Sequence, residues 1–141
     1  MSIIRFDSDI SEMAEYEPLP NGVYRATVID VEERSNEKTP KGFLTTTFRV
    51  SPDDYPIDYD ADNAPDGVNV VIGYLALPDA DNRRTVGPFK KFLTALGITP
   101  KGSQFETSDM IGAETQVHLV RGEFQGALVN NVQGVSPVPQ I

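Results

Sequence analysis

Two runs of residues constrain the fold of this chain most, because apolar and polar side chains alternate along both of them. They are GVYRATVIDVEE (residues 22–33) and FLTTTFRV (residues 43–50). A period of two is typical of a half-buried β-strand, since successive side chains point to opposite faces, and the β-branched residues in both runs favour the same structure. The polar segment between them (residues 34–42) carries a proline and a glycine, so the runs predict two successive strands joined by a turn.

The alternation assigns one face of each run to the core and the other to the outside. The residues expected in the core are Tyr24, Ala26, Val28, Leu44, Phe48 and Val50. The residues expected on the outer face are Arg25, Thr27, Phe43, Thr45, Thr47 and Arg49. The outer face of the predicted sheet therefore combines cations with an aromatic ring.

Four further segments complete the predicted fold. VNVVIGYLAL (residues 68–77), TQVHLVR (115–121) and ALVNNVQGV (127–135) are typical of strands, and PFKKFLTALG (88–97) has the apolar stripe of a helix. The order β-β-β-α-β-β predicts a mainly β fold, a five-stranded OB-type barrel with one helix between strands three and four. A split sheet covered by one helix is the competing architecture.

The length of 141 residues fits one domain. We place an OB-fold domain at residues 21–135, preceded by an N-terminal arm (1–20) and followed by a proline-rich C-terminal tail (136–141). Within the domain, residues 51–67 form a long acidic loop insertion between the second and third strands. The edge strands and the arm would permit a homo-oligomer.

Composition excludes several classes of site. There is no cysteine, so disulfides, thiolate metal sites and cysteine nucleophiles are excluded, and the single histidine, His118, argues against a zinc site or a Ser-His-Asp triad. No glycine-rich phosphate motif follows a strand. We therefore expect no enzyme activity, no catalytic residue, no metal and no cofactor. No apolar run reaches the ~18–20 residues of a membrane span and the N-terminus shows no signal-like pattern, so we expect a soluble, intracellular protein.

The negative charge of this acidic protein is concentrated in two segments. The formal net charge is −9, of which residues 1–17 contribute −4 and residues 53–66 contribute −6. The remaining residues sum to +1. The body of the predicted domain is therefore close to neutral, and the acidic total does not exclude a polyanionic partner.

The run DYDADNAPDG (residues 58–67) is open to three interpretations. Its first, third and fifth residues are aspartates, as in an EF-hand loop, but Asn63 and Asn69 stand where that loop needs a glycine and a bidentate glutamate. This mismatch argues against calcium. The two other interpretations are a solvated connection and an acidic flap that occupies a basic groove when nucleic acid is absent.

The order of these blocks resembles a known family. GVYRATVIDVEE, FLTTTFRV, PFKKFLTALGI and DMIGAETQVHLVRGEFQGALVNNVQGV together are similar to phage-encoded single-stranded DNA-binding proteins of the OB type, many of them catalogued as phage domains of unknown function. The resemblance covers residues 20–135. It implies sequence-tolerant binding of single-stranded DNA during phage DNA replication or recombination, in the cytoplasm of the infected host cell.

Proteins of that family often end in an acidic tail that competes with DNA and recruits replication partners, whereas this chain ends in the uncharged SPVPQI. We hypothesise that the acidic loop 53–66 takes the role of that tail. Because Tyr55 and Tyr59 lie among its acids, the loop is also a predicted docking point for phage or host replication proteins.

Sequence-tolerant binding needs cations for phosphates and flat side chains on which bases stack. In an OB barrel these lie on the outer face of the first three strands and in the flanking loops. The predicted contacts are Arg25, Arg34, Lys38, Lys41, Phe43, Thr45, Arg49, Tyr74, Arg83, Arg84, Arg121 and Phe124, with Arg34, Lys38 and Lys41 in the loop after the first strand and Arg121 and Phe124 in the loop after the fourth.

A different class of function remains open at this point. The acidic total also fits a phage protein–protein interaction or structural module without nucleic-acid binding, including an acidic inhibitor that imitates DNA. The sequence does not separate DNA from RNA as a ligand.

Overall fold

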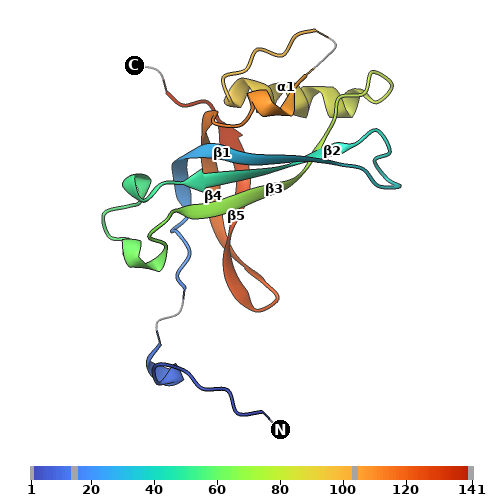
Figure 1. Ribbon diagram of the computed structural model, residues 1–141. Helices are drawn as coiled ribbons and strands as arrows, with labels where there is room; N and C mark the ends of the chain where they lie inside the picture. Colours follow the sequence, from blue (N-terminus) through green and yellow to red (C-terminus); the bar gives the residue numbers. More distant parts are fainter. Residues whose placement is uncertain (1, 14–15, 103–104, 140–141) are drawn as a thin grey trace.

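A single curled sheet of five antiparallel strands forms the body of the chain in the computed structural model, which describes residues 2–13, 16–102 and 105–139 (Figure 1). The strands are β1 (Gly22–Arg34), β2 (Phe43–Val50), β3 (Val68–Ala76), β4 (Glu114–Phe124) and β5 (Ala127–Ser136), in the order β3-β2-β1-β4-β5. The helix α1 (Val86–Ala95) lies between β3 and β4 in the sequence and across one end of the sheet (Figure 1). The mainly β prediction with an OB-type layout is therefore confirmed.

Strand β1 curls the sheet because its two halves pair with different neighbours. Residues 22–27 pair with β4, and residues 27–34 pair with β2. A register shift between Val28 and Asp30 lies where the second half begins, and such a bulge bends a strand. The curl brings the two end strands, β3 and β5, towards each other. The paired strands of the described residues do not include β3 with β5, so the predicted barrel is left open along this line.

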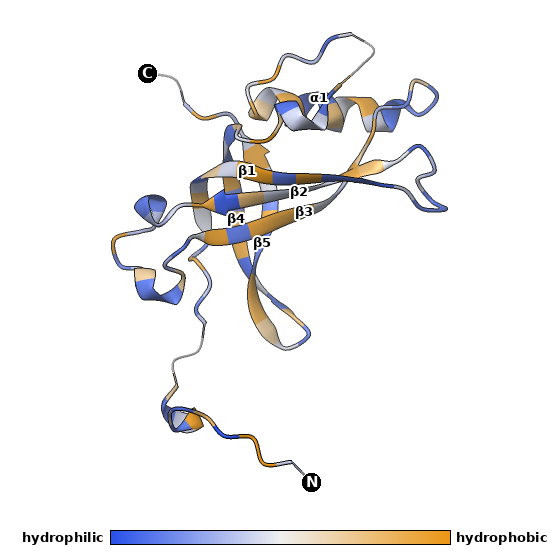
Figure 2. Cartoon of the chain, in the orientation of Figure 1, coloured by the Kyte–Doolittle hydropathy of each residue, from blue (hydrophilic) through white to orange (hydrophobic). Residues whose placement is uncertain are grey.

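The core lies inside the curl and under the helix. All six residues predicted to be buried on the first two strands are buried, with Phe48 and Val50 fully inaccessible. The ring of Phe48 meets that of Phe92 on α1 edge to face, with 6.2 Å between centroids. Figure 2 shows the apolar segments along the strands and helix and the hydrophilic ones in the turns. Burial of this inner face stabilises the fold, since each fully buried aliphatic or aromatic side chain contributes ~1.5–3 kcal/mol.

The helix begins and ends close to where the sequence predicts. It starts two residues before Pro88, which is tolerated in the first turn because its missing N–H has no partner there. Gly97 follows the helix with a φ of 77°, and its N–H donates to the carbonyl of Thr94. This is the left-handed helix end that glycine favours. Among the described residues, no helix has the length and apolarity to cross a membrane.

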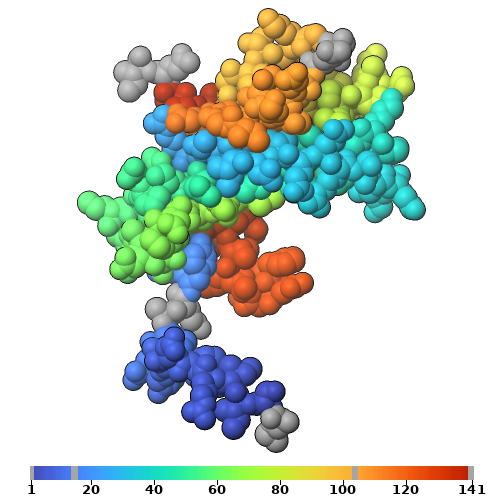
Figure 3. All heavy atoms as spheres, in the orientation of Figure 1, coloured from blue at the N-terminus to red at the C-terminus, as the bar shows by residue number. Residues whose placement is uncertain are grey.

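The N-terminal arm divides into two parts. Residues 2–13 are exposed and contain one 3-10 turn, Ile10–Glu12, whereas Leu19 is completely buried against the sheet. Figure 3 shows the first part as a lobe set apart from the body. Residues 1 and 14–15 of the predicted arm, and residues 140–141 of the predicted tail, lie outside the described residues.

Candidate nucleic-acid interface

The outer face of β1 and β2 has the composition that the alternation predicts. Arg25 and Arg49 are exposed, while Thr27, Thr45 and Thr47 are half-buried between strands. Thr27 pairs with Arg49 across the two strands. The Thr45 hydroxyl donates a 3.0 Å hydrogen bond to the carbonyl of Gly73 on β3, which links the face to the next strand.

An aromatic pair, Phe43 and Tyr74, lies at the end of this face. The ring centroids are 4.9 Å apart and the planes are inclined by 37°, a tilted arrangement at a centroid distance typical of interacting aromatic rings. A register shift between Leu44 and Thr46 on β2 places the ring of Tyr74 beside that of Phe43. Tyr74 is 55 % exposed, and its hydroxyl lies 2.7 Å from that of Thr39. Phe43 is half-buried, so the accessible part of this aromatic surface belongs mainly to Tyr74.

Five of the predicted cations lie at the same end of the sheet as the aromatic pair, in what we call the hairpin corner (residues 34–45 and 73–85). The β1–β2 hairpin is joined to the segment before α1 by the Lys41 Nζ–Asp79 Oδ1 ion pair of 3.1 Å and by a hydrogen bond from the N–H of Leu77 to the carbonyl of Gly42. This junction brings two sets of predicted cations to one end of the sheet (Figure 1). They are Arg34, Lys38 and Lys41 from the hairpin, and Arg83 and Arg84 from the 3-10 turn Arg83–Thr85.

Two acidic residues also lie on the outer face, and strict alternation misses them. Asp30 and Glu32 pair with Thr47 and Thr45 because the bulge in β1 reverses the parity after Val28. Glu32 forms an ion pair with Arg34. The sequence signal for the bulge is the appearance of charged residues at positions that a regular strand would turn towards the core.

At the other end of the face, Arg25 and Arg49 lie beside the acidic loop. A polar cavity of about 310 Å³ is lined by both arginines together with Asp53, Asp54 and Glu114. Arg25 forms an ion pair with Glu114, and the pKa of Arg25 is raised by that hydrogen bond and charge, with a smaller contribution from Asp54. Arg49 donates instead to the amide oxygen of Asn69, at 3.2 Å.

The predicted placement of Arg121 in a loop is wrong. Arg121 lies within β4, and its guanidinium donates to the carbonyls of Pro18 (2.7 Å) and Leu19 (3.1 Å) and to the carboxylate of Glu17 (3.3 Å). The cation therefore holds the root of the N-terminal arm against the sheet. The sequence gives almost no indication of this role, because the residues around an arginine in a strand do not distinguish a structural role from a binding role.

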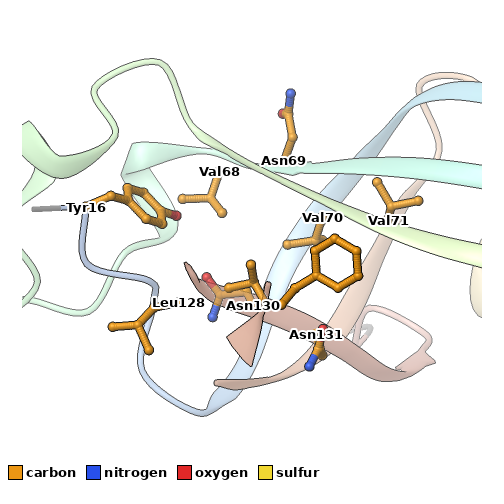
Figure 4. Close-up of a pocket in the computed structure, with 10 residues that line it drawn as sticks. Tyr16, Val68, Asn69, Val70, Val71, Leu128, Asn130 and Asn131 are labelled. Carbon is orange, nitrogen blue, oxygen red and sulfur yellow. The ribbon is translucent and has the colours of Figure 1, made fainter. Parts of the chain in front are cut away.

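Phe124 is also in β4 rather than in a loop, because the turn consists of Gln125 and Gly126 alone. Its ring is 66 % exposed and lines an apolar groove between β3 and β5, together with Val71 and Leu128. Figure 4 shows this groove. Phe124 is thus separate from the cations of the hairpin corner.

The predicted acidic flap is folded. It contains two 3-10 turns, Pro52–Asp54 and Ala61–Asn63, and two hydrogen-bonded tyrosines. The Tyr59 hydroxyl donates to the carbonyl of Glu17 at 2.5 Å, and the Tyr55 hydroxyl to that of Ala64 at 2.6 Å. Burial, with the neighbouring Tyr16, Tyr55 and Glu17, raises the pKa of Tyr59 to about 12. The described part of the chain contains no acidic or histidine cluster suited to a metal ion.

Of the eight predicted cations, half are engaged within the protein. Arg25, Arg34, Lys41 and Arg121 form ion pairs. Lys38, Arg49, Arg83 and Arg84 have no ion-pair partner within 4.0 Å among residues 2–13, 16–102 and 105–139. The site is therefore an accessible aromatic pair at the hairpin corner, where residues 34–45 and 73–85 hold five bases and three acids. Among the described residues, Lys38, Arg83 and Arg84 are the free cations of this corner, and Arg49 is the free cation at the other end of the face.

No protein-family model matches this chain, and a search of the curated proteins gives no match either.

Proposed function

We propose that this protein binds single-stranded DNA without sequence preference, by stacking bases on Phe43 and Tyr74 and contacting phosphates with the free cations of the hairpin corner and with Arg49 at the other end of the outer face. The observation that carries the proposal is the exposed aromatic pair at the hairpin corner, which contributes little to the core. Base–aromatic stacking contributes ~1–3 kcal/mol per base and tolerates any sequence, because every base has a flat face. The resemblance to phage single-stranded DNA-binding proteins supports a role in phage DNA replication or recombination.

The charge pattern makes stacking the larger contribution to affinity. Four free cations can neutralise about four phosphates, which corresponds to a salt dependence of roughly −3 in the slope of log affinity against log salt. The paired cations add less, since their charge is balanced by neighbouring carboxylates. We therefore expect binding that is moderate at low salt and retains a stacking component at higher salt.

Fluorescence anisotropy with a labelled oligo-dT tests the proposal at several salt concentrations. The wild-type protein should bind with a slope near −3, and Phe43→Ala should weaken binding by about fivefold to a hundredfold or more at every salt concentration. Arg49→Ala should instead reduce the slope by about 0.7. Absence of binding at low salt would eliminate the proposal.

A protein-binding module is the second candidate, and the engagement of half the predicted cations in ion pairs favours it. It predicts no binding of oligo-dT under any of these conditions. An acidic protein that imitates DNA makes the same prediction, and adds that the chain should bind a nuclease or repair enzyme. The docking of phage or host replication proteins on the acidic loop is compatible with DNA binding as well, and it involves the exposed residues of the loop, because Tyr59 is buried.

A further inference from the structure

The open line of the curled sheet carries an apolar groove with a volume of about 530 Å³ (Figure 4). Its apolar walls come from β3, β5 and the last residue of β4, and three of the side chains that line it are substantially exposed: Val71 (50 %), Phe124 (66 %) and Leu128 (52 %). In the described sheet, β3 pairs with β2 alone and β5 with β4 alone, so each has one edge of backbone groups without a strand partner. Such an edge is suited to pairing with an extended segment.

The N-terminal arm is an extended segment with exposed apolar side chains. Ile3, Ile4, Phe6 and Ile10 are 81, 77, 56 and 64 % exposed. In Figure 2 the beginning of the arm is apolar, and in Figure 3 residues 2–13 lie apart from the body. A concentration of exposed large apolar residues on one short segment is typical of an interaction element.

We infer that the arm of one copy of this chain docks in the β3–β5 groove of a second copy, and that the exchange is reciprocal. Ile4 and Phe6, two residues apart, face the same side of an extended segment and enter the groove together. Ten extended residues span up to about 33 Å, which is enough to reach a neighbouring copy.

Charge favours a second copy over the chain's own groove as the site of docking. The groove ends at Tyr16 and at the start of β3, next to the acidic loop, which carries −6 over residues 53–66. Folding back in the same chain would lead the acidic half of the arm (residues 7–12) into the groove beside that loop. An arm from another copy is free to enter in the opposite sense, with Arg5 beside the acidic loop and the acids away from it.

Sedimentation velocity of the full-length protein, without DNA, over a wide concentration range tests this inference. The wild type should show a monomer–dimer equilibrium, and dimerisation should strengthen as salt rises, because two copies with a charge of −9 repel each other. Ile4→Ser with Phe6→Ser should raise the dimer dissociation constant by about tenfold or more. Ile57→Ser is the matched control, since Ile57 is fully exposed outside both the arm and the groove, and it should leave dimerisation unchanged.

A mixing experiment identifies the groove as the receiving site. Leu128→Arg in the groove should weaken self-association by about tenfold or more, as should the double substitution in the arm. A mixture of these two variants should form a heterodimer, because one intact arm can still enter one intact groove. The inference would be overturned by a wild type that stays monomeric or by a mixture without heterodimer. Limited digestion with trypsin, which cleaves after Arg5, gives a third test. Protection of Arg5 that is the same at every protein concentration would mean that the arm docks in its own chain, and it would overturn the inference too. None of these outcomes bears on oligo-dT binding, so the two proposals fail separately.

Discussion

Two aromatic pairs of nearly equal spacing lie in different parts of the molecule, one at the hairpin corner and one in the acidic loop. Phe43 and Tyr74 are 4.9 Å apart at the hairpin corner, where Tyr74 is 55 % exposed. Tyr55 and Tyr59 are 5.0 Å apart in the acidic loop, where Tyr59 is only 8 % exposed. The first pair combines the exposed Tyr74 with the half-buried Phe43, and the second fastens the acidic loop to the root of the arm through the Tyr59–Glu17 hydrogen bond.

The comparison indicates that burial, and not residue type or neighbouring charge, distinguishes the ring proposed to bind from the structural one. Tyrosines interleaved with aspartates predict a docking motif from the sequence, yet in the fold their hydroxyls are bonded to backbone carbonyls. The surrounding aspartates stay exposed. Substitutions at the hairpin corner should therefore change mainly the affinity for DNA, and substitutions at the acidic loop and arm root should change mainly the stability of the fold.

The largest effect is expected from removing the exposed pair. Phe43→Ala with Tyr74→Ala should lower oligo-dT affinity by ~2–6 kcal/mol in total, because two stacking platforms are lost. The free energy of unfolding should fall less, since Tyr74 is exposed and the half-buried Phe43 lies outside the core cluster. Anisotropy and urea unfolding measure the two quantities, and Tyr74→Phe is the control that keeps the ring. A variant that binds as well as wild type would show that the exposed pair is not a stacking surface.

The next effect belongs to the structural end. Arg121→Leu should lower the free energy of unfolding by ~1–3 kcal/mol, because the carbonyl of Pro18 loses its partner and the arm root is released. Arg25→Leu is a matched control, since its ion pair with Glu114 is exposed and such pairs contribute ~0–1 kcal/mol. Urea denaturation distinguishes the two variants. Equal losses in the free energy of unfolding would mean that Arg121 does not hold the arm. Weaker oligo-dT binding by Arg121→Leu alone would indicate that Arg121 contacts DNA.

Features of the fold that depend on neighbouring residues are predicted from the sequence, whereas features that depend on residues far apart in the chain are not. Strand alternation is local, so the buried faces of β1 and β2 and the exposure of Arg25 and Arg49 are predicted correctly. The bulge after Val28 is also local, but only the charges at Asp30 and Glu32 signal it. The role of Arg121 depends on residues about a hundred positions away in the chain, and no local pattern carries that information.

The openness of the barrel is likewise a property of distant segments. β3 and β5 are each typical strands in the sequence, and whether their edges meet depends on how far the bulge in β1 bends the sheet. Periodicity predicts the presence of the strands but not the distance between their edges. The groove, and with it the placement of Phe124, was therefore beyond reach of the sequence.

A smaller effect concerns the pH dependence of the structural pair. The pKa of Tyr59 is raised from 10.0 to about 12 in the fold, so the unfolded chain loses this proton first as pH rises. The stabilising effect of the neutral hydroxyl is therefore complete below pH 10.0 and is lost as the pH approaches 12. Tyr59→Phe should lower the free energy of unfolding by ~1 kcal/mol at neutral pH, because the variant lacks the hydrogen bond to the Glu17 carbonyl. It should also flatten the decline of the free energy of unfolding above pH 10.0. Urea unfolding at a series of pH values measures both, and an unchanged alkaline slope would contradict the role of Tyr59.

The smallest effect tests whether the two ends influence each other. Asp53 and Asp54 line the same cavity as Arg25 and Arg49, so they lower the positive potential at that end of the outer face. Asp53→Asn with Asp54→Asn should therefore raise oligo-dT affinity at low salt by at most about fivefold, since exposed charge interactions contribute ~0.2–1 kcal/mol.

Asp60→Asn with Asp62→Asn is the matched control for this experiment. It removes the same charge from the same loop, at residues that do not line the cavity, and it leaves Tyr55 and Tyr59 in place. Deletion of the whole loop would instead remove both tyrosines and confuse loss of stability with loss of binding. Equal gains from the two pairs would mean that the loop acts through its total charge, whereas no gain from either would confine the loop to its structural role. A gain specific to Asp53 and Asp54, which disappears at high salt, is the result expected of a loop that shields the cations nearest to it.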